Sequence, residues 1–163
     1  MEKIKLGFAP TRRFCFSKED AHRFKNIILE KMKEYECVEL VDIEDVNEEG
    51  LLYDSVEDIE TIAEKFIANK VDAVFFPHCN FGTEDAVAKV AKKVGKPVLL
   101  WGPRDEDPLE DGTRLRDTQC GLFATGKILR RFNVKFTYIP NCDINDPIFA
   151  RGFDTFLRAV NVV

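Results

Sequence analysis

The stretch AVFFPHCNFGTEDAVAKVAKKVG, residues 73–95, decides the fold of this chain. It opens with a run rich in β-forming residues, and residues 73–76 are apolar on both faces, as in a central strand covered by helices on either side. A loop of small residues follows, and an amphipathic helix begins after Thr83. If the strand lies at the middle of a parallel sheet, the loop after it is where ligands are expected.

Length and composition are those of one globular domain. The chain has 163 residues, of which 45% are hydrophobic, and this is enough for one buried core. The net charge of −5 argues against a general binder of nucleic acid or anionic membranes, because both partners require clustered positive charge. No apolar run reaches the roughly 18 residues of a membrane span, and the first residues do not form a secretion signal. We therefore expect a cytoplasmic protein.

The cysteines do not form a recognisable pattern. They are odd in number and widely spaced, without a C-x-x-C pair or metal-ligand spacing: Cys15, Cys37, Cys79, Cys120 and Cys142. In a reducing cytosol we expect them to be free thiols, most of them buried as small hydrophobic residues.

The rest of the chain repeats the order of strand followed by helix. Strands are expected at residues 4–9, 38–43, 73–76, 98–101 and 135–139. Apolar residues at helical spacing predict helices at residues 18–35, after Ser55, after Thr83, at residues 118–132 and after Asp146. Five such units with short connections predict a parallel sheet, helices on both faces and right-handed crossovers. With no break in composition, residues 1–163 are expected to form a single domain.

The commonest five-stranded solution is the three-layer α/β flavodoxin-like, or Rossmann-like, fold with strand order 2-1-3-4-5. Its switch point lies between the first and third strands, so the loops at residues 10–16 and 78–82 should face each other. The long polar loop at residues 102–117 lies next to them, and unstructured loops of this length are typically functional or mobile. It brings three more arginines to this edge of the sheet: Arg104, Arg114 and Arg116.

Four side chains at this edge are candidate substrate-binding residues: Arg12, Arg13, His78 and Asn80. The arginine guanidinium groups suit a carboxylate, a phosphate or sugar hydroxyls, or they pair with the acidic residues that the chain has in excess. His78 is either a ligand or acid–base group, or a loop histidine that is hydrogen-bonded to the backbone. The acidic residues between positions 44 and 60 are interpreted as a solvated face.

Several other activities lack the residues that they require. The phosphate-binding motifs G-x-x-x-x-G-K-[ST] and G-x-G-x-x-G are absent, which argues against nucleotide and flavin binding. A receiver domain would need an aspartate after the third strand, where this chain has Pro77 and His78. Thiol catalysis by Cys79 stays an alternative, because the helix that follows would lower its pKa. His78, one residue away on an extended backbone, is poorly placed to act as its base.

Three long motifs resemble one known family: NFGTEDAVAKVAKKVGKPVLLWGPRDE, GTRLRDTQCGLFATGKILRRFNVKFTYIPN and FARGFDTFLRAVNVV. They make nearly the whole chain similar to the N-terminal domain of the L-fucose/L-arabinose isomerase family, in its fucose-isomerase-like branch. The resemblance implies a longer, cytoplasmic, homo-oligomeric enzyme that interconverts an aldose and a ketose with the help of Mn²⁺. It also implies that the metal ligands and acid–base groups lie in later domains. This chain then has no catalytic residue, no metal site and no cofactor of its own.

The resemblance further implies a role in covering the sugar substrate and forming the oligomer. In the family, N-terminal loops of a neighbouring subunit close the active site, and Arg12, Arg13 and residues 78–81 match those loops by position. Residues 161–163 carry no helix stop signal, so we expect a truncated N-terminal fragment or a split gene product that is inactive alone. The alternative is a stand-alone flavodoxin-like module that binds a small anion or sugar, or a protein-interaction domain. Neither nucleic acid nor a membrane is an expected partner.

Overall fold

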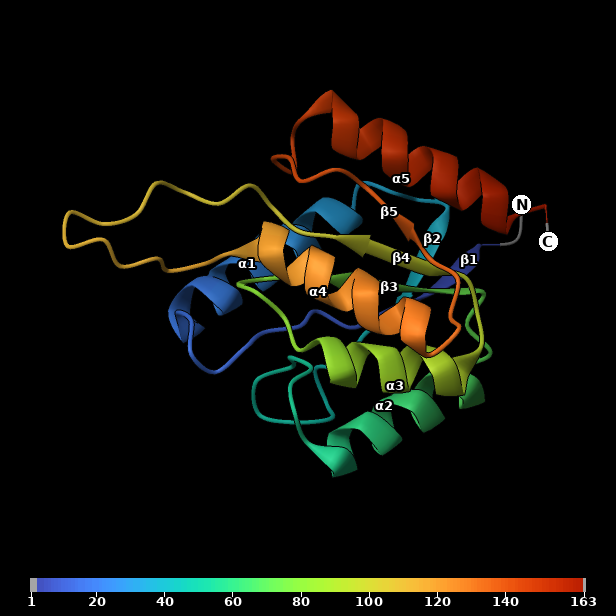
Figure 1. Cartoon of the computed structure of the whole chain (residues 1–163). Helices are drawn as coiled ribbons and strands as arrows, with labels where there is room; N and C mark the ends of the chain where they lie inside the picture. Colours follow the sequence, from blue (N-terminus) through green and yellow to red (C-terminus); the bar gives the residue numbers. More distant parts are fainter. Residues whose placement is uncertain (1–2, 163) are drawn as a thin grey trace.

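In the computed structural model of the chain, which describes residues 3–162, five strands alternate with five helices (Figure 1). The strands are β1 (Ile4–Phe8), β2 (Val38–Val41), β3 (Ala73–Pro77), β4 (Val98–Trp101) and β5 (Thr137–Tyr138). The helices are α1 (Lys18–Met32), α2 (Val56–Ala68), α3 (Glu84–Val94), α4 (Thr118–Arg131) and α5 (Pro147–Val160). The predicted alternation is confirmed. The predicted single domain and the predicted fragment end at residues 161–163 include residues 1, 2 and 163, which lie outside the described residues.

The strands form one parallel sheet in the order β2-β1-β3-β4-β5, which confirms the predicted order. The strand β3 is central: Phe75 aligns with Phe8 of β1 on one side and with Leu99 of β4 on the other. All five residues of β3 are buried, as its apolar sequence predicted.

Two hydrophobic clusters contact the sheet, and the residues of β3 alternate between them. Ala73 and Phe75 belong to a cluster that includes residues of α1 and α5. Val74 and Phe76 belong to a second cluster, with residues of α2, α3 and α4. Because successive side chains of a strand point to opposite faces, the two clusters lie on opposite sides of the sheet. In Figure 1, α5 lies above the sheet and α2 and α3 lie below it.

The helix ends follow local capping chemistry. The hydroxyl groups of Ser17 and Ser55 accept backbone N–H bonds at the starts of α1 and α2. Gly95 ends α3 with a left-handed φ of 65°, which glycine adopts without a Cβ clash. Thr83 precedes α3 but makes no side-chain cap, because its hydroxyl donates to the Arg12 carbonyl oxygen at 2.7 Å. Within residues 3–162, no helix combines the length and apolar character needed to cross a membrane.

Three elements are shorter than the sequence predicted by two residues or more, and β1 and α4 are each shorter by one. The strand β2 was expected over residues 38–43 and β5 over residues 135–139, but they contain four and two residues. Each lies at an edge of the sheet and has a neighbour on one side only, so its length depends on how far that neighbour pairs. The helix α1 ends at Met32 instead of Tyr35. The ring of Tyr35 still packs in the core, 4.6 Å from that of Phe153.

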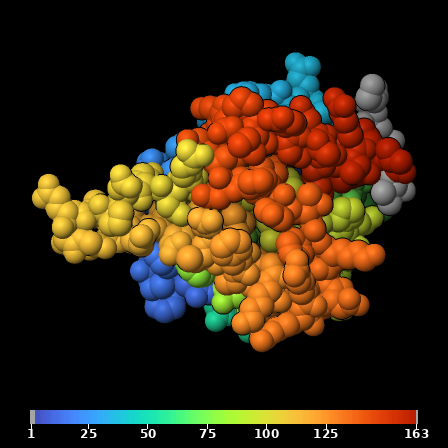
Figure 2. Space-filling view, turned by 45° about the horizontal axis from the view of Figure 1, so that its top comes forward, coloured from blue at the N-terminus to red at the C-terminus, as the bar shows by residue number. Residues whose placement is uncertain are grey.

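A projecting arm, residues 104–117, connects β4 to α4 and extends to the left in Figures 1 and 2. Two backbone hydrogen bonds close its tip: Leu109 N–H donates to Thr113 O at 2.9 Å, and Gly112 N–H donates to Leu109 O at 2.8 Å. Every residue from 107 to 115 is exposed. The tip of the arm therefore contributes nothing to the core.

The base of the arm is held by Arg116, whose side chain has no solvent exposure. Its guanidinium donates to the Arg104 carbonyl oxygen at 2.6 Å and to Glu106 Oε2 at 2.7 Å. The same group lies 3.7 Å from the ring centroid of Phe24 on α1. These contacts join both ends of the arm to the body of the domain.

Candidate functional site

The loops after β1 and β3 lie side by side at the carboxyl edge of the sheet. Thr11 and His78 form a parallel bridge. The Thr11 N–H donates to Pro77 O at 2.9 Å, and the Thr11 carbonyl accepts from Cys79 N at 2.9 Å. These bonds confirm that the two loops face each other, as expected for the switch point of this fold.

Thr11 also joins these loops to a third segment. Its hydroxyl donates to Leu52 O at 2.9 Å and accepts from Thr83 N at 3.0 Å, and the residue is fully buried. Buried polar groups with complete hydrogen bonding hold their neighbours in one arrangement. Thr11 was not among the predicted site residues, because a threonine after a strand-ending proline gives no local sign of such distant partners.

His78 lies at the centre of this edge but has no solvent exposure. Its Nδ1 lies 3.0 Å from Phe76 O, and a carbonyl oxygen only accepts, so Nδ1 carries the proton. Nε2 then accepts from the Thr125 hydroxyl of α4 at 2.8 Å. Burial lowers the pKa of His78 to about 4, against an opposing hydrogen bond to Phe76 O. The residue is a neutral link between β3 and α4, which matches the second of its two sequence interpretations.

The burial of His78 predicts a pH-dependent stability. Its folded pKa of about 4 lies below the ordinary value of 6.5, so between these values the unfolded chain binds a proton that the folded chain does not. The free energy of unfolding is therefore expected to fall by about 3 kcal/mol as the pH drops through this window, and to be unaffected by His78 above it. Urea unfolding across the window, with His78→Gln as the control, isolates this contribution. Parallel profiles for the two proteins would contradict it.

Asn80 is fully buried and uses its whole amide group within the chain. Its Oδ1 accepts from Arg13 N at 2.8 Å and from Phe81 N at 2.6 Å. Its Nδ2 donates to Arg13 O at 3.1 Å and to Ser17 O at 3.2 Å. A single side chain thereby fixes the loop after β1 on both sides of its tip.

Arg12 is largely buried and forms a two-pronged ion pair with Glu49. Its Nε lies 2.6 Å from Glu49 Oε2 and its Nη2 lies 2.9 Å from Oε1, while the guanidinium stacks over the Tyr53 ring at 4.6 Å. Lys18 Nζ adds a second cation, 2.9 Å from Oε1. Burial alone would raise the pKa of Glu49, but the hydrogen bonds from Arg12 and Lys18 outweigh burial and lower it to about 2. Arg12 therefore pairs with an acid of the chain, as the second interpretation of the arginines proposed.

The interpretation of the acidic residues between positions 44 and 60 as a solvated face is wrong for Glu49, which is largely buried. Its side chain is only 14% exposed, because the loop before α2 folds over the loop after β1. The partner positions are 37 residues apart in sequence, and no local pattern reveals such a pair.

Arg13 keeps part of its guanidinium at the surface. It pairs with Glu84 at the start of α3, donates to Gly82 O at 3.2 Å, and still has 28% of its side chain exposed. The group lies 4.6 Å from the Phe81 ring centroid, and Phe81 stacks on Phe16 at 5.3 Å with an interplanar angle of 14°. Of the four predicted residues, Arg13 is the one that presents a charged group to solvent.

Phe14 of the same loop faces solvent, with 87% of its surface exposed. The Asn80 amide holds the backbone on both sides of it, at Arg13 and at Ser17. The ring is therefore presented on a fixed loop. Phe14 was not among the predicted site residues, because its spacing does not distinguish it from the aromatic residues of the core.

The geometry excludes the catalytic-thiol alternative. Cys79 is fully buried, and burial raises its pKa to about 12. The thiol is therefore protonated at neutral pH, whereas a nucleophilic cysteine acts as the thiolate. Its Sγ lies 3.8 Å from Pro77 O, a weak contact within its own loop.

The three arginines of the long loop have different surroundings. Arg104 and Arg114 are exposed on the arm, whereas Arg116 is buried at its base. The arm starts beside the loops already described, since Asp117 N–H donates to Asn80 O at 2.8 Å and Ser17 N–H donates to Leu115 O at 3.0 Å. The carboxyl edge is thus a platform of two locked loops and one projecting arm.

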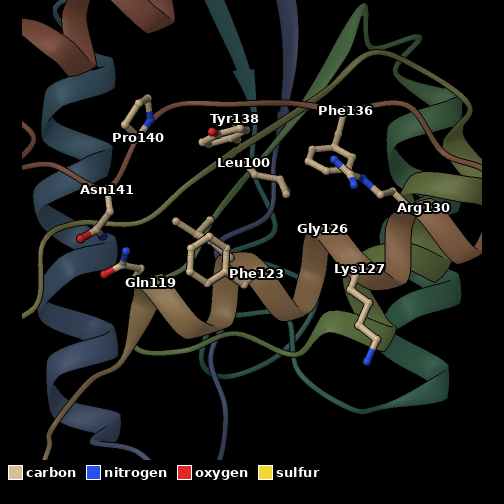
Figure 3. Close-up of a pocket in the computed structure, with 11 residues that line it drawn as sticks. Leu100, Gln119, Phe123, Gly126, Lys127, Arg130, Phe136, Tyr138, Pro140 and Asn141 are labelled. Carbon is tan, nitrogen blue, oxygen red and sulfur yellow. The ribbon is translucent and has the colours of Figure 1, made fainter.

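A separate groove of about 640 Å³ runs between α4 and β5 (Figure 3). Phe123, Phe136 and Tyr138 form most of its walls, with Leu100 between them. The polar residues Gln119 and Asn141 lie at one end, and Arg130 lies beside Phe136 at the other. This groove was not predicted. Its residues are exposed because β5 is the edge strand of the sheet, and the short β5 could not be predicted from local sequence.

The described residues do not provide a ligand set for a metal ion. Within positions 3–162, no three side chains of the types His, Cys, Asp or Glu are grouped closely enough to hold one. Glu49 and Glu84, the two acidic residues that contact Arg12 and Arg13, are both paired with those arginines.

Comparison with known proteins gives a consistent result. A family model described as fucose/sulfoquinovose isomerase, N-terminal domain, matches residues 7–163. Curated sulfoquinovose isomerases from Priestia aryabhattai and Priestia megaterium are each 23% identical over 164 residues. The match covers 100% of this chain but 34% of each relative, so the chain spans about a third of their length.

Among solved structures, an ABC transporter solute binding protein from Bacillus halodurans with bound myo-inositol matches 97% of this chain and 63% of its own. The TM-score is 0.41 at 10% sequence identity, so this likeness supports no statement about function. The family match, in contrast, confirms the resemblance drawn from the sequence motifs.

Proposed function

Because this chain belongs to the family of fucose/sulfoquinovose isomerase N-terminal domains, we propose that it acts as the non-catalytic N-terminal domain of an aldose–ketose isomerase. In this role it helps to cover the sugar and to form the homo-oligomer, in the cytoplasm. The observation that carries the proposal is the locked platform at the carboxyl edge. Its loops are held by Thr11 and Asn80 and present Arg13 and Phe14 outward.

Different residues of the platform are assigned different roles. Arg13 has a partly exposed guanidinium that suits sugar hydroxyls or a sulfonate, and the Phe14 ring suits the C–H face of a sugar. Arg12, His78 and Asn80 are buried and hold these two residues in place. All four residues predicted from sequence therefore have a role in the platform. Of these four, only Arg13 would contact the substrate, and the other three hold it in position.

The substrate is proposed from the names of the family and its curated members, which point to fucose-like sugars and to sulfoquinovose. The Mn²⁺ implied by the resemblance does not fit this chain, since the described residues offer no ligand set for it. We therefore place the metal ligands and the proton-transfer groups in the part of the isomerase that this chain does not contain.

Two assays test the proposal. This chain alone, with Mn²⁺, is expected to give no turnover of L-fucose, D-arabinose or sulfoquinovose. A chimera in which it replaces the N-terminal third of the Priestia megaterium sulfoquinovose isomerase is expected to be more active than that enzyme without its N-terminal third. In the chimera, Arg13→Ala should raise KM for the sugar.

The matched control is Arg151→Ala, which removes an exposed arginine from α5, outside the platform. Turnover by the isolated chain would contradict the non-catalytic role. A chimera no better than the truncated enzyme would contradict the proposed cover over the substrate.

A further inference from the structure

The groove between α4 and β5 exposes aromatic side chains that the domain does not cover. Phe123 is 69% exposed and Tyr138 is 61% exposed, and both line the groove beside Leu100 (Figure 3). Exposed apolar surface bordered by polar residues marks an interaction site. The groove lies on α4 and β5, whereas the platform consists of the loops after β1 and β3 and the arm.

Two cations line the groove, Lys127 and Arg130, and the described part of the chain gives neither of them an ion pair. By contrast, Arg12, Arg13 and Arg116 each pair with a carboxylate. The chain has a net charge of −5, so acidic residues are in excess and yet none pairs with these two. Unpaired cations beside an apolar groove favour a partner that carries an acidic group.

The edge of the sheet adds free backbone groups. Ile139 N–H donates to Leu100 O at 2.9 Å, and in a parallel ladder alternate residues bond to the same neighbour. Tyr138, which aligns with Leu100, therefore directs its N–H and C=O away from β4. Within residues 3–162, β5 pairs with β4 alone, and no strand lies on its other side. Such an edge accepts an additional extended strand.

The dimensions of the groove favour a short peptide segment over a single sugar. From Gln119 to Arg130 it follows α4 for about 16 Å, at a helical rise of about 1.5 Å per residue. An extended segment of about five residues, at about 3.3 Å each, spans this length. Pro140 has no N–H to offer, which limits the length of added strand that β5 can pair with.

We infer that the groove binds an extended segment of a partner polypeptide, which pairs with β5 at Tyr138. Its alternate side chains face the groove, and these are apolar over Phe123 and acidic beside Arg130. The intervening side chains face the other side of the sheet, the side on which Ile139 packs with α5. The inference does not depend on the proposed isomerase function, because it involves other residues.

The probe is the peptide acetyl-Glu-Thr-Val-Thr-Val-Thr-Glu-amide, which presents two valines and two terminal acids on one face in either strand direction. Titration of the ¹⁵N-labelled chain should shift the amide signals of Phe123, Arg130 and Tyr138. The same peptide with lysine in place of both glutamates should bind at least about tenfold more weakly. N-methylation of the amides that face β5 should abolish binding.

Charge reversal supplies the matched control. The double variant Lys127→Glu/Arg130→Glu should prefer the lysine peptide, while Lys96→Glu/Arg158→Glu, with the same change in net charge at exposed sites, should not. Amide spectra of both variants establish that they are folded. Equal binding of the two peptides by the original chain would overturn the inference. So would the absence of shifts at millimolar peptide.

Discussion

Replacing Gly121 by alanine is expected to lower the free energy of unfolding by about 3 kcal/mol or more, the range of severe overpacking. A Cβ at this position would lie 1.8 Å from the carbonyl oxygen of Phe81 and 2.7 Å from its carbonyl carbon. These are backbone atoms of the loop after β3, so a side-chain rotation cannot relieve the clash. Either α4 or this loop must shift, and the bonds of Asn80 and His78 would be strained. Chemical denaturation measures the loss.

Gly126, in the same helix, is the matched control. An added Cβ there would meet the ring of Phe136 at 3.2 Å, a contact that a small ring movement relieves. Alanine favours the helix over glycine by about 1 kcal/mol, so Gly126→Ala should be close to neutral or stabilising. Equal losses of unfolding free energy for Gly121→Ala and Gly126→Ala would contradict the claim that the contact between α4 and the Phe81 backbone stabilises the fold.

Replacing Asn80 by leucine is the second change with a large expected effect, a loss of about 3 kcal/mol or more in unfolding free energy. Leucine has a similar size but leaves the N–H groups of Arg13 and Phe81 and the carbonyls of Arg13 and Ser17 without their partner. Unpaired buried polar groups cost more than the hydrogen bonds themselves contribute. Amide hydrogen exchange in residues 13–17 should also accelerate.

Asn80→Asp separates the two halves of this amide. The carboxylate keeps the acceptor that serves the two N–H groups, but it places a buried charge and a second oxygen against the carbonyls of Arg13 and Ser17, so a large loss is expected here too, centred on these two carbonyls. A leucine variant as stable as the original chain would show that other contacts hold the loop.

Much of the fold could be predicted because its strongest signals are local. The run at residues 73–76 is apolar on both faces, as in a strand covered on both sides, and the commonest order of five strand–helix units placed it in the middle of the sheet. The lengths of β2 and β5 could not be predicted in the same way. An edge strand ends where its single neighbour stops pairing, and that depends on the tertiary structure.

The strand order predicted that the loops after β1 and β3 lie side by side, but the exposure of their residues was not evident from the sequence. Chain order and the strand arrangement bring the loops of Arg13 and His78 together. Which side chains of a loop turn inward depends on distant partners, such as Thr125 for His78 and Glu49 for Arg12. Phe14 is the opposite case, since an aromatic side chain suggests a core residue and yet 87% of its surface is exposed.

The length of the arm can change without any change in the core of the domain. All residues from 107 to 115 are exposed, so insertions and deletions there remove no buried contact. Lengthening a flexible loop is inexpensive, since each doubling adds only about 0.6 kcal/mol of closure entropy. Because Arg116 anchors the base at Arg104 and Glu106, relatives with longer or shorter arms would keep the same direction of projection and differ in how far it extends.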